Sequence, residues 1–400
     1  MLEDTNSRTS PPPEPIDRLQ GNFKIYVSLM YENSHQLAFF IYRNNPTMSK
    51  LNLAVVYGGK STEHEISILS TKSILKYLDQ SRYNISLVYI DINGHWFLKT
   101  DIADEANQPV TMVPSPEGAQ LIDLSSGNNL TRVDVAFPVL HGLFGEDGTI
   151  QGFFKMVNVP FVGCGVMASS ACMDKDMTKR VLRDCGIGIA PYMIATPDHK
   201  PTFQDLEKQL GMPIFIKPAN LGSSVGVFKV STEAEYKLKI EEALGYDHKV
   251  LIETTIVGKE VECAVLGNDK PKASLPGEVV METEFYDFES KYVDKDASST
   301  LIPADISQVQ IDLIRETAVK AYSAMGCEGL ARVDFFVTEK EEVLINEINT
   351  IPGFTNISMY PKMWEATGIP YSELLDILIE LGIERFKQEQ ELRIHAKAVE

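Results

Sequence analysis

Arg332-Val-Asp334 and Glu347-Ile-Asn349-Thr-Ile-Pro-Gly353 are the two stretches that decide the fold. Each lies within or at the end of a run rich in Val, Ile, Leu and Phe, and a short charged turn separates the runs. This pattern predicts two adjacent antiparallel strands. Glu347 and Asn349 are two positions apart, so they point to the same face of their strand, where Asp334 can join them.

The side chains of this hairpin match a magnesium-nucleotide site. Mg²⁺ binds hard oxygen ligands, usually a few carboxylates together with phosphate oxygens, and Asp, Glu and Asn meet that need. Arg332 would add a fixed cation on the same face as Asp334. The alternative is a solvated acidic hairpin without a ligand, so the rest of the chain has to decide between the two.

Composition limits the class of protein. A chain of 400 residues is long enough for two or three domains, and 44% hydrophobic with 23% charged residues is ordinary for a globular protein. The formal net charge of -19 argues against a nucleic-acid partner, because phosphate backbones require clustered Lys and Arg. We therefore expect a small-molecule ligand.

Cysteine usage and hydropathy predict the compartment. The five cysteines form an odd set without a C-x-x-C spacing, which is typical of reduced thiols in a cytoplasmic protein. No apolar run approaches the ~20 residues needed to span a bilayer, and the chain does not open with a signal peptide. We expect a cytoplasmic protein without membrane association.

Strand and helix patterns alternate from residue 51 onward, which predicts an α/β protein. The residues before Met48 lack sustained periodicity, so they are predicted to be disordered or to precede the native start. The predicted segments are an extension at 1–47, three successive units at 48–165, 166–256 and 257–388, and a tail at 389–400.

Lys217-Pro-Ala-Asn-Leu-Gly-Ser223-Ser224-Val-Gly226 lies between two strand-like runs. Its glycines allow backbone amides to approach phosphate, and two hydroxyls add donors. Lys217 ends an apolar strand, where half-burial of its charge is costly without an anion. The loop is predicted to cover a triphosphate; the alternative is a flexible structural hairpin. A Walker A loop is excluded, because no Gly-Lys-Ser/Thr follows these glycines and Ala54 stands where the earlier Gly-Gly-Lys-Ser run needs its first glycine.

Gly58-Gly59 ends the first predicted strand and leads into a helix that is expected to start with a capping box, Thr62-x-x-Glu65. A strand, a glycine turn and a helix N-terminus form a site that favours anions. Glu63 suits the helix dipole at this position. Its alternative role is to hold the ammonium group of a substrate.

His141 follows another strand-like run, Val133 to Leu140, and precedes three glycines within seven residues. Open α/β sheets bind ligands at this carboxyl edge. A ligand contact and a structural role are both open for His141.

The stretch from Glu284 to Thr300 is aromatic and charged without clear periodicity. It is predicted to be a lid loop, which would exclude water from a reactive intermediate. Lys291 would reach phosphate and Tyr292 a neighbouring side chain. The alternative is a solvent loop pinned by its aromatic side chains.

Taken in this order, the motifs resemble those of the D-alanine-D-alanine ligases of the ATP-grasp superfamily over about residues 51 to 385. A series of ordered motifs is a more specific signal than a single glycine loop. The matching segments are Gly58 to Ser67, His141 to Gly152, Gly163 to Ser169, Met173-Asp-Lys175, Lys217 to Gly226, Lys291-Tyr292, Arg332-x-Asp334 and Glu347 to Thr355.

The resemblance implies a fold: an ATP-grasp fold preceded by a doubly wound N-terminal α/β domain. It makes 48–165 the N-terminal substrate domain, 166–256 the central ATP-grasp subdomain and 257–388 the C-terminal ATP-grasp catalytic domain. It also implies a homodimer.

The resemblance implies a reaction as well. ATP would phosphorylate the carboxylate of one D-alanine, and the amine of a second D-alanine would attack the acyl phosphate. The products would be D-alanyl-D-alanine for peptidoglycan precursors, ADP and phosphate. Such chemistry needs cations at the transferring phosphoryl group, a positioned amine and a site closed to water.

Several site residues follow from the resemblance. The nucleotide would be bound by three phosphate lysines, the amides near a loop serine, and two glutamates facing adenosine: Lys175, Lys217, Lys291, Ser224, Glu253 and Glu260. Two Mg²⁺ ions, or Mn²⁺ in their place, would be held by Asp334, Glu347 and Asn349.

The remaining residues would act on the two amino acids. Glu63 would bind the first ammonium group, with His141 near the carboxylate. Arg332 and the Gly353 amide would stabilise the oxyanion, and Ser358 and Met359 would meet the second substrate. Glu63, Ser223 and Tyr292 would form a hydrogen-bonded trio.

One departure and three alternatives stand beside this interpretation. Many relatives have Lys after the adenine-side glutamate, where this chain has Thr254. The closest alternative is a ligase that joins D-alanine to D-lactate or D-serine, although Tyr292 favours an amine acceptor. The others are a non-catalytic ATP-binding regulator, which would have lost a metal ligand or Arg332, and a kinase or carboxylase that stops at an acyl phosphate.

Overall fold

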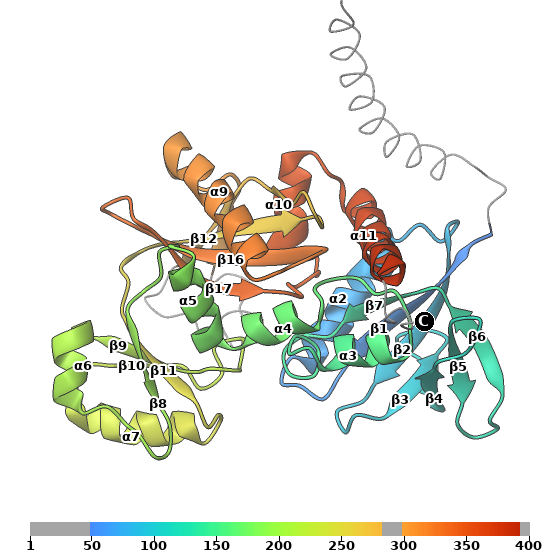
Figure 1. Ribbon diagram of the computed structural model, residues 1–400, viewed down its shortest axis with the longest axis horizontal. Coiled ribbons are helices and arrows are strands. Elements are labelled where there is room, and N and C mark those ends of the chain that lie inside the picture. The colour runs from blue at the N-terminus through green and yellow to red at the C-terminus, as the bar shows by residue number, and fades with distance from the viewer. Residues whose placement is uncertain (1–48, 282–297, 393–400) are drawn as a thin grey trace, which may run out of the picture. The chain divides into compact units, whose positions relative to one another are not determined.

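The computed structural model in Figure 1 describes residues 49–281 and 298–392. The predicted extension at 1–47 lies outside this range, as do Lys291 and Tyr292 of the predicted lid. From Leu51 onward the chain forms one unit, and its described residues form three β-sheets. None of the helices in the described ranges has the length and apolar character needed to cross a membrane.

The first sheet has seven strands in the order β6-β5-β4-β3-β2-β1-β7. Strand β1, next to the edge strand β7, pairs in parallel with β2 and β7, and the strands from β2 to β6 pair antiparallel. The strands are β1 (Leu51–Gly58), β2 (Tyr83–Ile90), β3 (Trp96–Lys99), β4 (Gln108–Val113), β5 (Ala119–Asp123), β6 (Asn129–Val133) and β7 (Val135–Val139).

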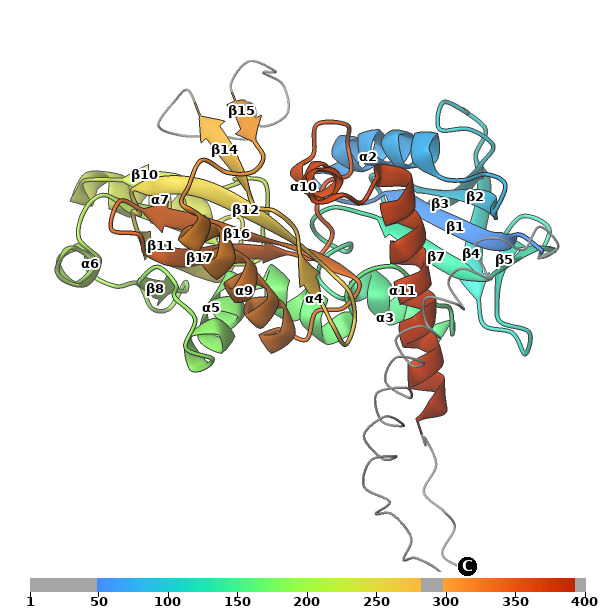
Figure 2. The same ribbon diagram turned by 90° about the horizontal axis from the view of Figure 1, so that it is seen from above.

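Helices cover both faces of this sheet, as the doubly wound prediction requires. Leu53 of β1 packs in a core with Ile74 of α2 (His64–Tyr77). Ala54, the next residue, packs in another core with Phe154 of α3 (Thr149–Met156). Since successive strand residues point to opposite faces, a strand covered on both sides is apolar throughout. Figures 1 and 2 both show the long helix α11 (Tyr371–Glu391) beside β7 and α2.

The predicted capping box at the start of α2 is wrong. The helix begins at His64, and its N-cap residue Glu63 makes no side-chain cap hydrogen bond. The Glu63 carboxylate instead accepts a hydrogen bond from Ser223, which is distant in the sequence. The start of α2 is therefore bonded to a distant loop and not closed by a local capping box.

The second sheet has the order β10-β9-β11-β8, and all its pairs are antiparallel. Helix α7 begins with a capping box in which Thr232 and Glu235 bond each other's backbone amides. The elements are β8 (Tyr192–Ala195), α6 (Phe203–Leu210), β9 (Ile214–Pro218), β10 (Phe228–Val230), α7 (Glu233–Leu244) and β11 (Val250–Thr254).

The third sheet has the order β15-β14-β12-β16-β17, with β13 beside β12. Its strands are β12 (Gly258–Leu266), β13 (Lys272–Ala273), β14 (Gly277–Met281), β15 (Ser298–Leu301), β16 (Leu330–Thr338) and β17 (Val343–Asn349). The nearby helices are α4 (Val166–Met173), α5 (Lys175–Asp184), α9 (Gln308–Ala324) and α10 (Met359–Thr367).

The predicted hairpin is confirmed as β16 and β17. Val333 and Phe335 face a core shared with residues of α4, α5 and α9. The pleat therefore turns Arg332 and Asp334 to the opposite face. Apolar packing on one face holds the polar residues of the other face in place.

Candidate active site

The strand register brings the predicted metal ligands together. Asp334 lies opposite Glu347 and Arg332 opposite Asn349, and a bulge follows Asp334. Asn349 Nδ2 donates to Asp334 Oδ2 at 2.9 Å. Arg332 forks onto the same carboxylate, with Nε to Oδ1 and Nη2 to Oδ2 both at 2.7 Å. Bulges are common beside active sites, where they redirect a side chain.

Arg332 is a permanent cation in this site. Burial lowers its pKa, but the carboxylates of Asp334 and Glu262 outweigh that effect and raise the pKa well above its ordinary value. Glu262 lies 3.1 Å from Arg332 Nε. Arg332 is thus held rigidly and charged, as a group that stabilises an oxyanion must be.

The ligand set of the hairpin suits a divalent cation that also binds phosphate. Asp334 and Glu347 provide carboxylate oxygens and Asn349 an amide oxygen, all of them ligands that Mg²⁺ accepts. Within residues 49–281 and 298–392, no group of three or more His, Cys, Asp or Glu side chains could hold a metal ion by itself. Phosphate oxygens would have to complete the coordination, as Mg²⁺ sites at nucleotides require.

Two predicted phosphate lysines reach this hairpin from different elements. Lys175, the first residue of α5, lies 3.6 Å from Glu347 and donates to the carbonyl oxygen of Leu221 at 2.6 Å. Lys217 on β9 lies 3.3 Å from Asn346 Oδ1 and 2.7 Å from Glu253 Oε2. Both ammonium groups therefore lie beside the β16–β17 hairpin.

The glycine loop joins β9 to β10 in a strained backbone conformation. Ser223 has φ of 52° and Ser224 of 59°, although neither is glycine. Non-glycine residues in this region are costly and cluster at ligand-binding loops. Ser223 Oγ donates to Glu63 Oε1 across 160 residues of sequence. Two members of the predicted trio are therefore bonded, and the third, Tyr292, lies outside the described residues.

His141 is buried and bonded through both ring nitrogens. Nδ1 lies 3.0 Å from the carbonyl oxygen of Ile351, and Nε2 lies 3.0 Å from Ser70 Oγ. Burial lowers the pKa of His141, although Glu63 opposes the effect. The imidazole joins the end of β7 to the segment that follows β17, while its contact with a substrate stays a prediction.

Glu146 is a residue of this site to which the sequence analysis assigned no role. Its two carboxylate oxygens accept from the Gly142 amide at 2.9 Å and the Ile351 amide at 3.1 Å. Burial, and then the charge of Glu63, raise its pKa to about 8. Glu146 lies in the quoted His-Gly motif, but the motif contains no indication that its partner would be Ile351.

The predicted second-substrate residues lie at the start of α10. A Cβ atom on Gly353 would stand 2.8 Å from Ser358 Oγ, so these two residues are adjacent. Ser358 Oγ also accepts from the Thr355 amide at 2.9 Å. The Met359 side chain is buried in the core, which leaves a side-chain contact with the substrate without support.

The two glutamates that are predicted to face adenosine have different environments. Glu253 on β11 is buried and forms ion pairs with Lys179 and Lys217. Glu260 on β12 is half-buried. Lys179 is a second residue that the sequence analysis missed, because its partner lies on another element.

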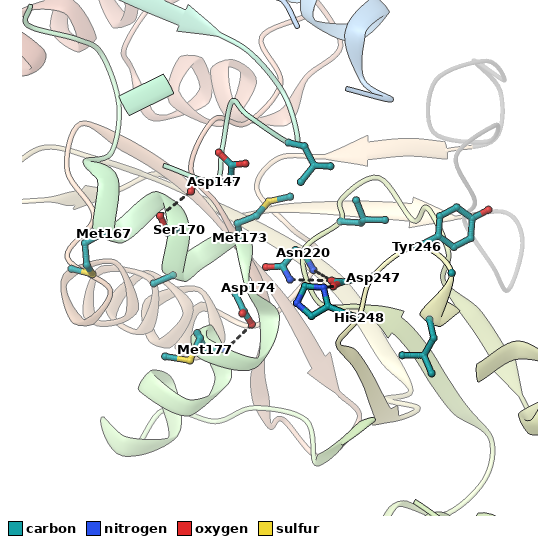
Figure 3. Close-up of a pocket in the computed structure, with 15 residues that line it drawn as sticks. Asp147, Met167, Ser170, Met173, Asp174, Met177, Asn220, Tyr246, Asp247 and His248 are labelled. Carbon is teal, nitrogen blue, oxygen red and sulfur yellow. Dashed lines mark hydrogen bonds and ion pairs between the residues drawn. The ribbon is translucent and has the colours of Figure 1, made fainter. Parts of the chain in front are cut away.

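Two pockets adjoin these groups. Figure 3 shows one of about 840 Å³, lined by residues of α4 and α5, by Asn220 of the glycine loop and by Asp247 and His248 before β11. The carboxylates of this pocket form hydrogen bonds with neighbouring residues. Asp247, for example, accepts hydrogen bonds from the backbone amide and the side chain of Asn220. A second pocket of about 350 Å³ is mostly apolar and includes Gly59 and His141. Only the second contains a predicted site residue.

Comparison with known proteins finds matches to one family along most of the chain. Residues 52–164 match the family model of the D-ala D-ala ligase N-terminus and residues 181–380 that of the C-terminus. D-alanine--D-alanine ligase A of Escherichia coli (strain K12) is 48% identical over 361 residues, which cover 86% of this chain and 99% of that relative.

Two solved structures are similar in fold and sequence. The D-alanine-D-alanine ligase of Coxiella burnetii has a TM-score of 0.78 at 41% identity, covering 86% of this chain and 97% of its own. The VanG D-Ala:D-Ser ligase of Enterococcus faecalis has a TM-score of 0.75 at 35% identity, covering 84% of this chain and 100% of its own. With both halves matched by its models, the chain belongs to the D-alanine-D-alanine ligase family.

Proposed function

We propose that this protein uses ATP to join two D-alanine molecules to D-alanyl-D-alanine, as a step toward peptidoglycan precursors. The observation that supports this best is the hydrogen bond from Ser223 to Glu63. It links the loop expected to cover the phosphates to the residue expected to bind the first ammonium group. Nucleotide and amino acid would thus bind side by side.

The first step is phosphoryl transfer to the carboxylate of the first D-alanine. A carboxylate oxygen attacks the γ-phosphorus, and the bond to ADP breaks. Lys175 and Lys217, which contact the glycine loop and the hairpin, would neutralise phosphate oxygens, and the loop at Ser224 would cover them. Asp334, Glu347 and Asn349 would hold Mg²⁺, or Mn²⁺, which supplies charge neutralisation at the transferring group.

The second step is attack by the amine of the second D-alanine on the acyl phosphate carbon. The C–N bond forms as the carbonyl oxygen becomes an oxyanion, and the amine loses a proton. The C=O bond then forms again and phosphate departs. Arg332 would stabilise the oxyanion together with the Gly353 amide, because a fixed cation needs no reorganisation during the reaction. Ser358, adjacent to Gly353, would contact the second substrate.

A D-serine acceptor is the second candidate. A structure similar to this chain at 35% identity is a D-Ala:D-Ser ligase, so the shared fold does not separate the two acceptors. A non-catalytic regulator is less consistent with the chain, because the three predicted metal ligands and Arg332 are all present and in contact.

Location and assembly extend the same proposal. A cytoplasmic enzyme has access to ATP. The five cysteines are free, and the sulfurs of Cys172 and Cys327 lie 3.8 Å apart without a disulfide bond, as expected in a reducing compartment. A homodimer is what the family resemblance implies.

The test is phosphate release from ATP and Mg²⁺ with D-alanine as the only amino acid, with the product identified by mass. We expect D-alanyl-D-alanine. Release that requires added D-serine or D-lactate would contradict the acceptor, and silence with all three would contradict the ligase.

A matched variant tests the metal assignment within this assay. Glu347→Gln keeps the shape of the side chain and removes its charge, so the rate should fall about a hundredfold or more. Glu339→Gln, an exposed change in the turn of the same hairpin, serves as the control. Normal turnover in Glu347→Gln would refute the metal role.

A further inference from the structure

We propose that Lys179 is a positioning residue for base selection: it holds Glu253 so that one carboxylate oxygen can accept a hydrogen bond from the 6-amino group of adenine. The inference rests on the proposed function, which places Glu253 beside adenosine. Lys179 is not among the residues predicted for the site.

Helical spacing explains why Lys179 faces the nucleotide region. Lys175 and Lys179 are four positions apart on α5, so they lie on the same face of the helix. Lys175 reaches the glycine loop through the carbonyl oxygen of Leu221. Lys179, one turn further, forms an ion pair with Oε1 of Glu253. The helix therefore directs one ammonium group toward the phosphates and the other toward the base.

Burial makes this ion pair a fixed element of the site. Lys179 is 1% exposed and Glu253 is 2% exposed. The Lys179 ammonium also lies over the Tyr192 ring, 5.8 Å from its centroid. Removing one member of such a pair leaves a buried charge without compensation, which is strongly unfavourable. Lys179 thus fixes one oxygen of Glu253 and helps to keep the carboxylate charged.

The two oxygens of Glu253 have different partners. Oε1 is paired with Lys179, whereas Oε2 accepts from Lys217 at 2.7 Å. Burial raises the pKa of the Glu253 carboxyl, but the two lysines together lower it below its ordinary value. Glu253 is therefore ionised and can only accept hydrogen bonds.

Nucleotide binding would separate these two partners. Lys217 also lies 3.3 Å from Asn346 Oδ1, next to the metal ligand Glu347, and it is assigned to the phosphates. When Lys217 turns to the triphosphate, Oε2 becomes available, while Lys179 retains Oε1. An amino group at purine position 6 donates to Oε2, whereas an oxo group there meets an acceptor and is disfavoured. Lys179 would thereby favour adenine over hypoxanthine.

Binding of ADP and IDP by the full chain tests this inference. We would measure both affinities by titration calorimetry with Mg²⁺ for the wild type, Lys179→Met and Lys179→Arg. Lys179→Met should weaken ADP about tenfold and IDP about threefold or less, and Lys179→Arg should restore most of the preference. Arg183→Met, an exposed change on the same helix, should alter neither affinity.

Three results would overturn the inference. A wild type that binds ADP and IDP equally would show that Glu253 does not read position 6. Equal losses for both nucleotides in Lys179→Met would reduce the lysine to a general charge or packing role. No loss at all would remove any role in binding.

A second pair of variants keeps the test decisive if Lys179→Met alone does not fold. Lys179→Met with Glu253→Gln removes both members of the Lys179–Glu253 pair at once, and Glu253→Gln alone has the same effect on Lys217, so the two variants differ only at Lys179. Its ADP-to-IDP preference should equal that of Glu253→Gln within about twofold, because Lys179 acts through Glu253. A further tenfold change would contradict that dependence.

The proposed function can fail separately, since calorimetry needs no D-alanine. In the ligase assay, Lys179→Met should raise the KM for ATP about tenfold and change kcat about threefold or less. A fall in kcat with an unchanged KM would contradict a positioning role.

Discussion

At the scale of single residues, Glu146 makes stability depend on pH. Burial and the charge of Glu63 raise its pKa from the ordinary 4.5 to about 8. Between these values the folded protein retains a proton that the unfolded chain releases. Stability is therefore complete below the lower value and falls as pH rises toward 8, by up to ~1.4 kcal/mol per pH unit.

Glu146→Gln should remove this slope. Thermal unfolding at about pH 5.5 and about pH 8.5 should show a larger loss for the wild type than for the variant. Glu207→Gln, an exposed change on α6, should behave like the wild type. Equal pH dependence in the wild type and Glu146→Gln would mean that the carboxyl does not titrate in this window.

At the scale of elements, the β9–β10 loop depends on α2 for its position. Ser223 and Ser224 occupy a costly backbone region, and the bond from Ser223 to Glu63 helps to hold them there. Ser223→Ala should lower kcat/KM about tenfold, because a hydrogen bond to a charged group contributes ~1.5–3 kcal/mol. The melting temperature should fall by only a few degrees, because a loss of this size changes the melting temperature of a large chain little.

The control for this loop is Ser323→Ala, which removes an exposed hydroxyl from α9. The measurement is the steady-state rate of phosphate release for both variants, which should fall in Ser223→Ala and stay unchanged in Ser323→Ala. If Ser223→Ala keeps the full rate, the loop is held by its own backbone and not by Glu63.

At the scale of the whole molecule, the sequence predicts local strands and turns better than it predicts which distant residues come into contact. The β16–β17 hairpin could be predicted because apolar alternation and a charged turn are local signals. Strands β3 to β6 were not predicted, because they are short and their periodicity is weak. Glu146 and Lys179 were missed for another reason: their partners, Ile351 and Glu253, lie far away in the sequence.

The positions of the site residues in the whole molecule indicate which part of the chain the activity needs. Every site contact described above lies between Glu63 and Met359, within the unit that begins at Leu51. The match to the ligase family models also begins at residue 52. Deletion of residues 1–47 should therefore leave kcat and both KM values within about twofold of the full chain. Phosphate-release kinetics of the two proteins, compared at equal concentration, check this expectation. A larger loss would assign the extension a direct part in catalysis or assembly, and sedimentation of the two forms would show which of these it is.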